Sequence, residues 1–175
     1  MPFPWEVAGS SHGPQGMTEL MEHKTKRDGV FVNQFGEARP SVVMWSPAAD
    51  AAIAHLNRWI EGGVPPARQP LIAVSGNPPA IDRDEHGIAK GGVRLPDVQV
   101  PTGCNTGYNA GAGLEALVGS TQPFPPAKLK KLYPSHDAYV AKVAAAARAA
   151  REAGVILAHA ESDYVERAKA STILE

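Results

Sequence analysis

The sequence of 175 residues predicts a chain of mixed strand and helix content, with short strands, amphipathic helices and many loops. Three observations support this prediction. A short apolar run ends in a polar, glycine-bounded loop, later segments show one apolar face at helical spacing, and the middle is interrupted by proline and glycine. With 17 glycines and 16 prolines, much of the chain is expected to be turn and loop.

Composition and charge exclude several classes of protein. The net charge is -1 and no basic stripe is present, which argues against a nucleic-acid partner. No apolar stretch approaches the roughly 20 residues of a membrane span, and the N-terminus lacks the features of a signal peptide. The single cysteine, Cys104, cannot form an internal disulfide and fits no metal-ligand spacing. Compartment and oligomeric state do not follow from the sequence.

The first predicted strand covers residues 5–8 and ends at the loop Gly9-Ser10-Ser11-His12-Gly13. Residues 13–45 show no period and are predicted to be a long irregular connection. A helix is predicted over residues 47–61, with Ser46 as N-cap and Pro47 at its first position. Its apolar face consists of Ala52, Ile53, Leu56, Trp59 and Ile60, and Gly62-Gly63 end it.

The middle of the chain is predicted to be irregular. Residues 71–74 could be a strand, residues 82–87 form a polar turn, and residues 93–100 make at best an edge strand because Pro96 interrupts them. Helices follow over residues 127–132, from the cap Ser135 to Gly154, and over residues 162–172.

His12 is the candidate catalytic residue. A histidine base must accept a proton from a nucleophile and be oriented by an acid. In α/β-hydrolases the triad runs Ser, then Asp or Glu, then His, so the histidine comes last, on a loop after a strand. Residues 5–13 provide such a setting, although a polar loop histidine without function fits the same pattern.

No nucleophile accompanies His12 in the sequence. The G-x-S-x-G pattern that exposes a catalytic serine is absent, and its nearest lookalikes, Ser75 and Ser120, lack flanking glycines at the required spacing. Both are predicted to be turn residues, and Ser135, although followed by His136, is better explained as a helix cap.

A metal site is the rival interpretation. Asp82, Asp84, Glu85 and His86 offer oxygen and nitrogen ligands within five residues, a spacing that could suit calcium. The run has no glutamate at its twelfth position, and His55 has no partner histidine at helical spacing. A solvated turn is the preferred interpretation of this cluster.

Taken together, several segments resemble the C-terminal region of the large bacterial alpha/beta hydrolase domain proteins, a family of serine hydrolases. The resemblance is carried, in order, by Trp5-Glu6-Val7-Ala8-Gly9-Ser10-Ser11-His12, His55-Leu56-Asn57-Arg58-Trp59-Ile60, Arg83-Asp84-Glu85-His86-Gly87, residues 91–101 and residues 132–140.

The resemblance implies the C-terminal portion of an α/β-hydrolase fold. Residues 1–66 would supply the last core strand, the histidine loop and the closing helix, and residues 67–175 a loop-rich, helical extension. It also implies that His12 is the triad histidine. The family usually has an aspartate after this motif, where the chain has Gly13-Pro14, so we expect a differently built loop there.

The implied function is hydrolysis of carboxylic esters, with a small-molecule ester as substrate of the intact parent and no cofactor or metal. Nucleophile and acid would lie before Met1, so the chain alone is expected to be inactive. The alternative is a non-catalytic truncated product or a helical interaction module. In a fragment the apolar face of helix 47–61 would lose its cover, so we expect exposed apolar surface and poor solubility.

Overall fold

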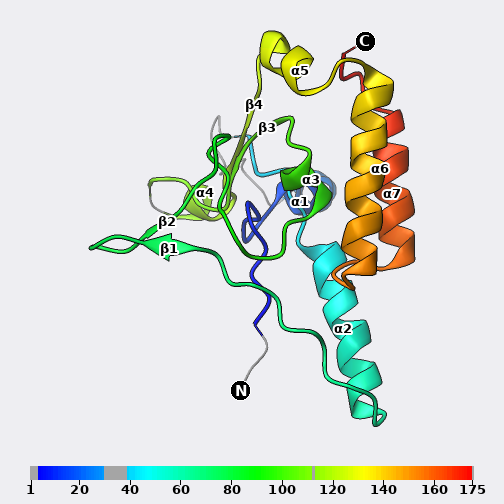
Figure 1. The fold of residues 1–175 in the computed structure, drawn as a ribbon. Helices are drawn as coiled ribbons and strands as arrows, with labels where there is room; N and C mark the ends of the chain where they lie inside the picture. Colours follow the sequence, from blue (N-terminus) through cyan, green and yellow to red (C-terminus); the bar gives the residue numbers. More distant parts are fainter. Residues whose placement is uncertain (1–3, 30–38, 112, 175) are drawn as a thin grey trace.

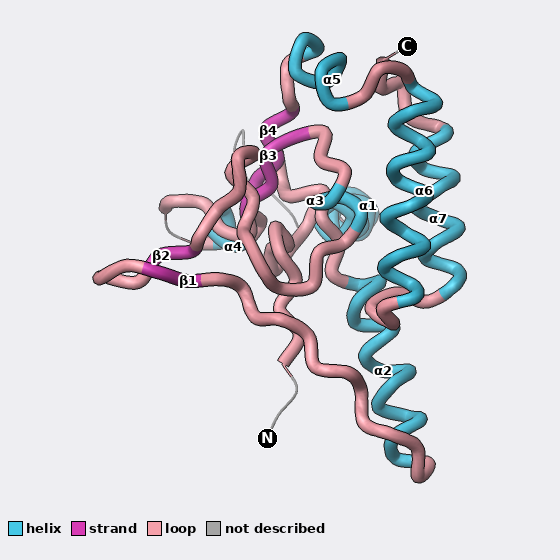
Figure 2. Tube along the Cα trace, viewed as in Figure 1, coloured by secondary structure: helices cyan, strands magenta, loops and turns pink. Residues whose placement is uncertain are grey.

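A computed structural model describes residues 4–29, 39–111 and 113–174 (Figure 1). Helices and short strands share one chain of the α/β class, and loops connect most of them (Figure 2). The elements in order are α1 (Gln15–Asp28), α2 (Ser46–Ile60), β1 (Val74–Ser75), β2 (Ala80–Ile81), α3 (Pro96–Gln99), β3 (Gly103–Thr106), α4 (Leu114–Leu117), β4 (Ser120–Pro123), α5 (Pro126–Leu132), α6 (His136–Glu152) and α7 (Ala158–Lys169).

The α6–α7 pair is the most regular part of the molecule (Figure 1). Ser135 caps α6 as predicted, since its hydroxyl accepts a hydrogen bond from the N–H of Ala138 at 3.1 Å. Gly154 follows α6 with φ of 72°, a conformation that glycine adopts without steric cost. Five alanines are among the buried residues of the two helices: Ala146, Ala147, Ala150, Ala160 and Ala168.

Of two helices predicted near the C-terminus, one is found as expected and the other begins earlier than predicted. The helix over residues 127–132 is confirmed by α5, within one residue. The last helix was placed too late, because α7 begins at Ala158 rather than at Ser162. Leu157 is the extended residue before it, and buried Ala160 belongs to its core-facing side. The small alanines of its first turn give a weak hydrophobic signal, which explains the late start predicted from the sequence.

Residues 93–100 do not form the edge strand expected from their partial alternation. Leu95 is extended, and Pro96 starts the short helix α3, where its missing N–H costs no hydrogen bond. Within this stretch Val93, Leu95 and Val98 are buried almost completely. A buried helix turn and a buried strand both appear as an apolar run, so periodicity alone could not distinguish them.

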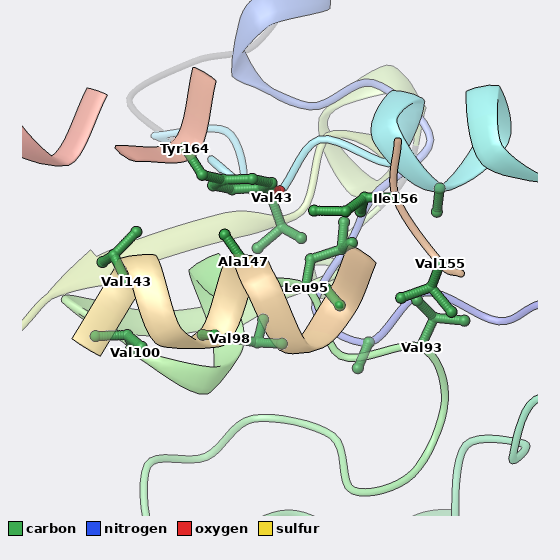
Figure 3. Close-up of a cluster of buried hydrophobic side chains, with 14 of the residues drawn as sticks. Val43, Val93, Leu95, Val98, Val100, Val143, Ala147, Val155, Ile156 and Tyr164 are labelled. Carbon is green, nitrogen blue, oxygen red and sulfur yellow. The ribbon is translucent and has the colours of Figure 1, made fainter. Parts of the chain in front are cut away.

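One hydrophobic cluster holds the described chain together (Figure 3). It includes Ala8, Val43 and Ala48 from before the expected domain boundary at residue 66, and many residues from after it. The later members include Ile88, Leu95, Val98, Val143, Ile156 and Tyr164. The two expected domains therefore share one core, while their boundary stays a prediction. No described helix is long and apolar enough to cross a membrane.

A buried carboxylate joins α3 to α7. Only 16% of the Asp97 side chain is exposed, and its Oδ2 accepts a hydrogen bond from the hydroxyl of Tyr164 at 2.8 Å. The guanidinium of Arg167 lies 3.8 Å from Oδ1 and stacks over the Tyr164 ring. Burial raises the pKa of Asp97, and Arg167 and Tyr164 only partly offset this effect.

The strands are few and short. In the glycine-rich stretch β3 pairs antiparallel with β4, from Gly103 opposite Pro123 to Thr106 opposite Ser120, a hairpin that the sequence did not predict. β1 pairs with β2 at the edge of the molecule, so the strand suggested at residues 71–74 is found only in part. The strand predicted at residues 5–8 is reduced to one parallel bridge between Val7 and Val93.

The long irregular connection predicted for residues 13–45 is wrong for residues 15–28, which form α1, whereas residues 30–38 lie outside the described part. The sequence of α1 shows no clear hydrophobic period, because the helix buries little apolar surface. Its buried residue is Thr18, and its Leu20 is 58% exposed. Side-chain pairs four residues apart support it instead, such as Glu22 with Lys26 at 2.8 Å. Gly29 ends it in a left-handed conformation.

Helix α2 confirms the prediction for residues 47–61 almost exactly in extent, although Trp45 rather than Ser46 is its N-cap residue and no side chain caps it. Its predicted apolar face is exposed, with Ile53 at 58% and Ile60 at 74%. The expectation of exposed apolar surface on this helix is therefore confirmed.

The pKa of Asp97 gives a pH-dependent prediction. The folded chain keeps the Asp97 proton to higher pH than the unfolded chain, whose aspartates titrate near 3.9. Stability contributed by the protonated carboxyl is thus complete below about pH 3.9 and is lost as the pH rises through the raised pKa. We expect Asp97→Asn to raise the melting temperature at pH 7 by roughly 2–4 °C and to change it little at pH 4.

Thermal unfolding followed by circular dichroism at the two pH values checks this. Asp163→Asn is the matched control, because Asp163 is an exposed aspartate on α7, the helix that also carries Tyr164 and Arg167. A loss of stability at pH 7 in Asp97→Asn would show that the contact with Arg167 outweighs the cost of burying the charge.

Candidate functional site

His12 lies in a turn that follows a bridged segment of backbone. The N–H of Ala8 donates to the carbonyl of Val93 at 3.0 Å, and the N–H of Val93 donates to the carbonyl of Glu6 at 2.6 Å. The chain then reverses at Gly9, with φ of 73°, and the N–H of Ser10 returns to the carbonyl of Val7. The predicted order of an extended segment followed by a polar loop is therefore present, although a single bridge replaces the expected strand.

The turn is tied to the segment around Ser41. The buried hydroxyl of Ser41 donates to the carbonyl of Gly9 at 2.8 Å, and the carbonyl of Ser41 accepts from the N–H of Gln15 at 2.8 Å. These two bonds hold the residues before and after His12 to one point of the backbone. The N–H of Ser41 itself donates to the carbonyl of Val118, which ties this point to the stretch before β4.

Gly9 makes the closest approach between the turn and the core. A Cβ at this position would lie 2.9 Å from Cγ1 of Val98 and 3.3 Å from Cβ of Asn105. Real Cβ atoms do not come that close to side chains, and the positive φ excludes most other residues as well. α3 and β3 therefore form the support beneath the residue that starts the histidine turn.

The far end of the turn is held by the glycine-rich stretch. The N–H of Gly13 donates to the carbonyl of Leu117 at 3.2 Å, and a Cβ on Gly107 would lie 2.3 Å from the carbonyl oxygen of Ser10. Pro14 is buried and precedes α1 as its N-cap residue. Gly13-Pro14, where the resembled family usually has aspartate, thus forms a buried corner leading directly into a helix.

The side chain of His12 points outward from this support. The residue is exposed, and within residues 4–29, 39–111 and 113–174 no hydrogen bond, ion pair or ring contact engages its imidazole. Next to it Ser11 is 5% exposed, and its hydroxyl has no partner in the described chain. The backbone at His12 is constrained, while both ring nitrogens remain available to accept or donate a proton.

The described residues do not bring a nucleophile or an acid to His12. Ser75 donates to Asp82 on the β1–β2 hairpin, and the hydroxyl of Ser120 lies 3.0 Å from that of Thr106. Ser135 caps α6, as predicted. No serine of the described chain is hydrogen bonded to a histidine, so a complete triad is not formed there.

The acidic cluster at residues 82–86 is a turn held by its own contacts. Oδ1 of Asp84 accepts from the N–H groups of His86 and Ile88, at 2.9 and 3.0 Å, and Oδ2 accepts from Arg94 at 2.9 Å. Although burial opposes it, these contacts lower the pKa of Asp84. Its oxygens thus already have partners, and no group of three metal-ligating residues occurs in the described part of the chain.

His55 is a structural residue rather than a second candidate base. Arg58 Nη2 lies 3.0 Å from its Nδ1, and because arginine only donates, Nδ1 accepts and Nε2 carries the proton. Nε2 then donates to the carbonyl of Gly154 at 2.8 Å. The ring of Trp5 packs edge-on against it, which links α2 to both the N-terminal segment and the end of α6.

Sequence reasoning missed the polar cluster of Asp97, Tyr139, Tyr164 and Arg167, which lines a cavity of about 100 Å³ between α3, α6 and α7. Ligand sites usually enclose about 300–1,000 Å³, so this cavity is too small for an ester substrate. Its signal in the sequence was the one carboxylate, Asp97, in the otherwise largely apolar run of residues 95–100. A larger concave surface of about 660 Å³ lies at the end of α2, away from His12, and is open to solvent.

Comparison with known proteins places the chain in a family. Residues 4–166 match the family model described as alpha/beta hydrolase domain, which covers most of the sequence. The chain therefore belongs to the alpha/beta hydrolase domain family, as its resemblance predicted. No curated protein and no solved structure matches it significantly.

The support beneath the histidine turn can be tested by adding one methyl group. We expect Gly9→Ala to destabilise the fold by about 2–4 kcal/mol, because alanine at positive φ and a Cβ against Val98 both cost energy. Gly29→Ala is the matched control: Gly29 also has positive φ, at 67°, but no atom of the described residues lies near its Cβ position. It should cost about 1 kcal/mol.

Equilibrium unfolding in urea measures both free energies. Equal losses in the two variants would mean that the turn is not packed on α3.

Proposed function

We propose that the chain provides the triad histidine of a serine-type carboxylic ester hydrolase and that His12 is its general base. The observation that carries the proposal is an exposed imidazole, without a partner among the described residues, on a constrained turn directly after a parallel-bridged segment. Membership of the alpha/beta hydrolase domain family supports the hydrolase class. The serine and the acid would come from polypeptide outside these 175 residues.

In the proposed reaction His12 takes the proton of the serine hydroxyl as the serine oxygen attacks the ester carbonyl carbon. The tetrahedral intermediate collapses, the bond to the alcohol oxygen breaks, and the imidazolium returns the proton to the leaving alcohol. A water molecule then attacks the acyl-enzyme with the same assistance and releases the carboxylic acid. None of these steps requires a cofactor or a metal.

The order of triad residues along α/β-hydrolases agrees with this assignment. Serine comes first, the acid second and histidine last. A histidine at position 12 would then follow both partners, which fits the lack of a G-x-S-x-G pattern in the sequence and the absence of a serine–histidine contact in the described residues. On this basis the chain alone does not turn over esters.

A second candidate function, a non-catalytic helical interaction module, is favoured by one observation. The apolar stripe of α2 is exposed, although the opposite side of the same helix is packed in the core. The two functions are compatible, because α2 and His12 lie on different parts of the described chain.

The test uses the gene product that contains this chain. We expect it to hydrolyse p-nitrophenyl butyrate and to react covalently with a fluorophosphonate probe. His12→Ala should lower kcat by about 10³-fold or more, because the serine loses its base. His23→Ala is the matched control, since His23 is an exposed histidine on α1 and should leave kcat unchanged.

Steady-state kinetics and the rate of probe labelling measure these effects. Activity that persists in His12→Ala would overturn the assignment. So would a gene product that starts at Met1, without preceding polypeptide, and still hydrolyses the ester.

A further inference from the structure

Helix α2 has two apolar faces of different kind. One face is made of small side chains and is packed in the core, with Ala48 2% and Ala51 0% exposed. The other carries branched side chains and faces solvent, with Ile53 at 58% and Ile60 at 74% exposure. The alanine face is sufficient to pack α2 against the core of this chain. The face with branched side chains has no partner within the described chain.

The first half of α2 is anchored, and its second half projects from the body (Figure 1). The anchors are the buried alanines of the first turns and the hydrogen bond from His55 to the carbonyl of Gly154. Beyond this point the helix continues to Ile60, past the ends of α6 and α7 in Figure 1. A second helix could therefore lie along the exposed face without displacing the core.

The exposed face follows the spacing of a coiled coil. Its members are the half-buried Ala49 and the exposed Ile53, Leu56 and Ile60, separated by four, three and four residues. In a heptad Ile53 and Ile60 occupy position a, and Ala49 and Leu56 occupy position d. Isoleucine at a with leucine at d is the combination that favours two parallel strands.

We propose that this face is a dimer interface, on which α2 of a second copy of the chain packs in parallel and in register. In such a pair, position g of one helix meets position e of the other, five residues further along. These pairs are Trp45 with Asp50 and Ala52 with Asn57 of the partner copy. None places like charges together, so no electrostatic term opposes the parallel arrangement.

The available area sets the expected strength. The exposed parts of Trp45, Ile53, Leu56 and Ile60, together with Val64 just beyond the helix, amount to roughly 500 Å² per copy, so the pair would bury at most about 1,000 Å², the lower limit for a specific interface. The structure therefore points to a weak, reversible dimer with a micromolar Kd. Such a dimer would cover the exposed apolar face of α2, which in a monomer favours nonspecific association.

Sedimentation velocity of the 175-residue chain between about 1 and 100 µM tests the proposal. The mass should rise from 18.5 kDa towards twice that value with concentration. Ile53→Glu or Ile60→Glu should raise Kd by about 30-fold or more, because each places a charge at position a in both copies. Leu20→Glu is the matched control, since Leu20 is equally exposed but lies on α1.

A monomer at the highest concentration overturns the proposal, as does association that Ile53→Glu leaves unchanged. Association that Leu20→Glu weakens as much as Ile53→Glu would indicate nonspecific aggregation and would also contradict it. These results do not depend on ester hydrolysis, so they are separable from the assignment of His12. A dimer of the 175-residue chain that the full gene product does not form would show that other polypeptide covers this face, and would also overturn the proposal.

Disulfide trapping tests the direction of the two helices. In a Cys104→Ser background, Ala49→Cys should give a covalent dimer under mild oxidation, because d positions of a parallel pair face each other at disulfide distance. Ala54→Cys, on another side of α2, should not. Failure of Ala49→Cys to cross-link in a protein that sediments as a dimer would exclude the parallel arrangement.

Discussion

The structure depends on the close approach of the Gly9 backbone to Val98 and Asn105. No side chain fits between these groups, so the chain must place glycine at the residue where the N-terminal segment turns towards His12. The contact joins Gly9 to residues that are about 90 to 100 positions away in the sequence. It makes the geometry of the histidine turn a property of the middle of the chain, rather than of the turn itself.

The support beneath the turn continues to the C-terminus. Val98 belongs to α3, where Asp97 receives the hydrogen bond of Tyr164 from α7. Because α3 is a single turn of helix, it has little stability of its own and relies on this contact and on the surrounding core. The C-terminal helices therefore fix α3, and α3 in turn fixes the residue that precedes the histidine loop.

In this arrangement the C-terminal region contributes to the core that supports the histidine turn. The sequence predicted a loop-rich, helical extension over residues 67–175, and the buried cluster takes residues from both sides of that expected boundary. In the proposed hydrolase, the histidine would be positioned by the region that follows it, while the serine and acid would be positioned elsewhere. The exposed stripe of α2 lies outside this support, which is why an association on that helix need not disturb the histidine turn.

Sequence patterns predicted the elements whose signals are local. The cap of Ser135, the proline start and glycine stop of α2, and Gly154 after α6 all depend on neighbouring residues. The patterns failed where distant contacts decide the structure. α3 appeared as an irregular strand because its burial comes from α6 and α7, and α1 was missed because polar pairs replace an apolar face.

The same distinction applies to the candidate site. Its residue and its position after an extended segment were predictable, because a glycine-bounded loop is a local feature. The roles of Ser41 and Leu117 were not, because hydrogen bonds from Ser41 to Gly9 and from Gly13 to Leu117 connect segments without any shared pattern. We infer that these contacts hold the turn rigid while leaving the His12 imidazole accessible.

Backbone ¹⁵N relaxation of residues 9–13 tests this claim most directly. A turn held at both ends should give order parameters near 0.85, like those of the α6–α7 pair. Values below about 0.6 would show a mobile loop and would contradict the view that the fold positions His12.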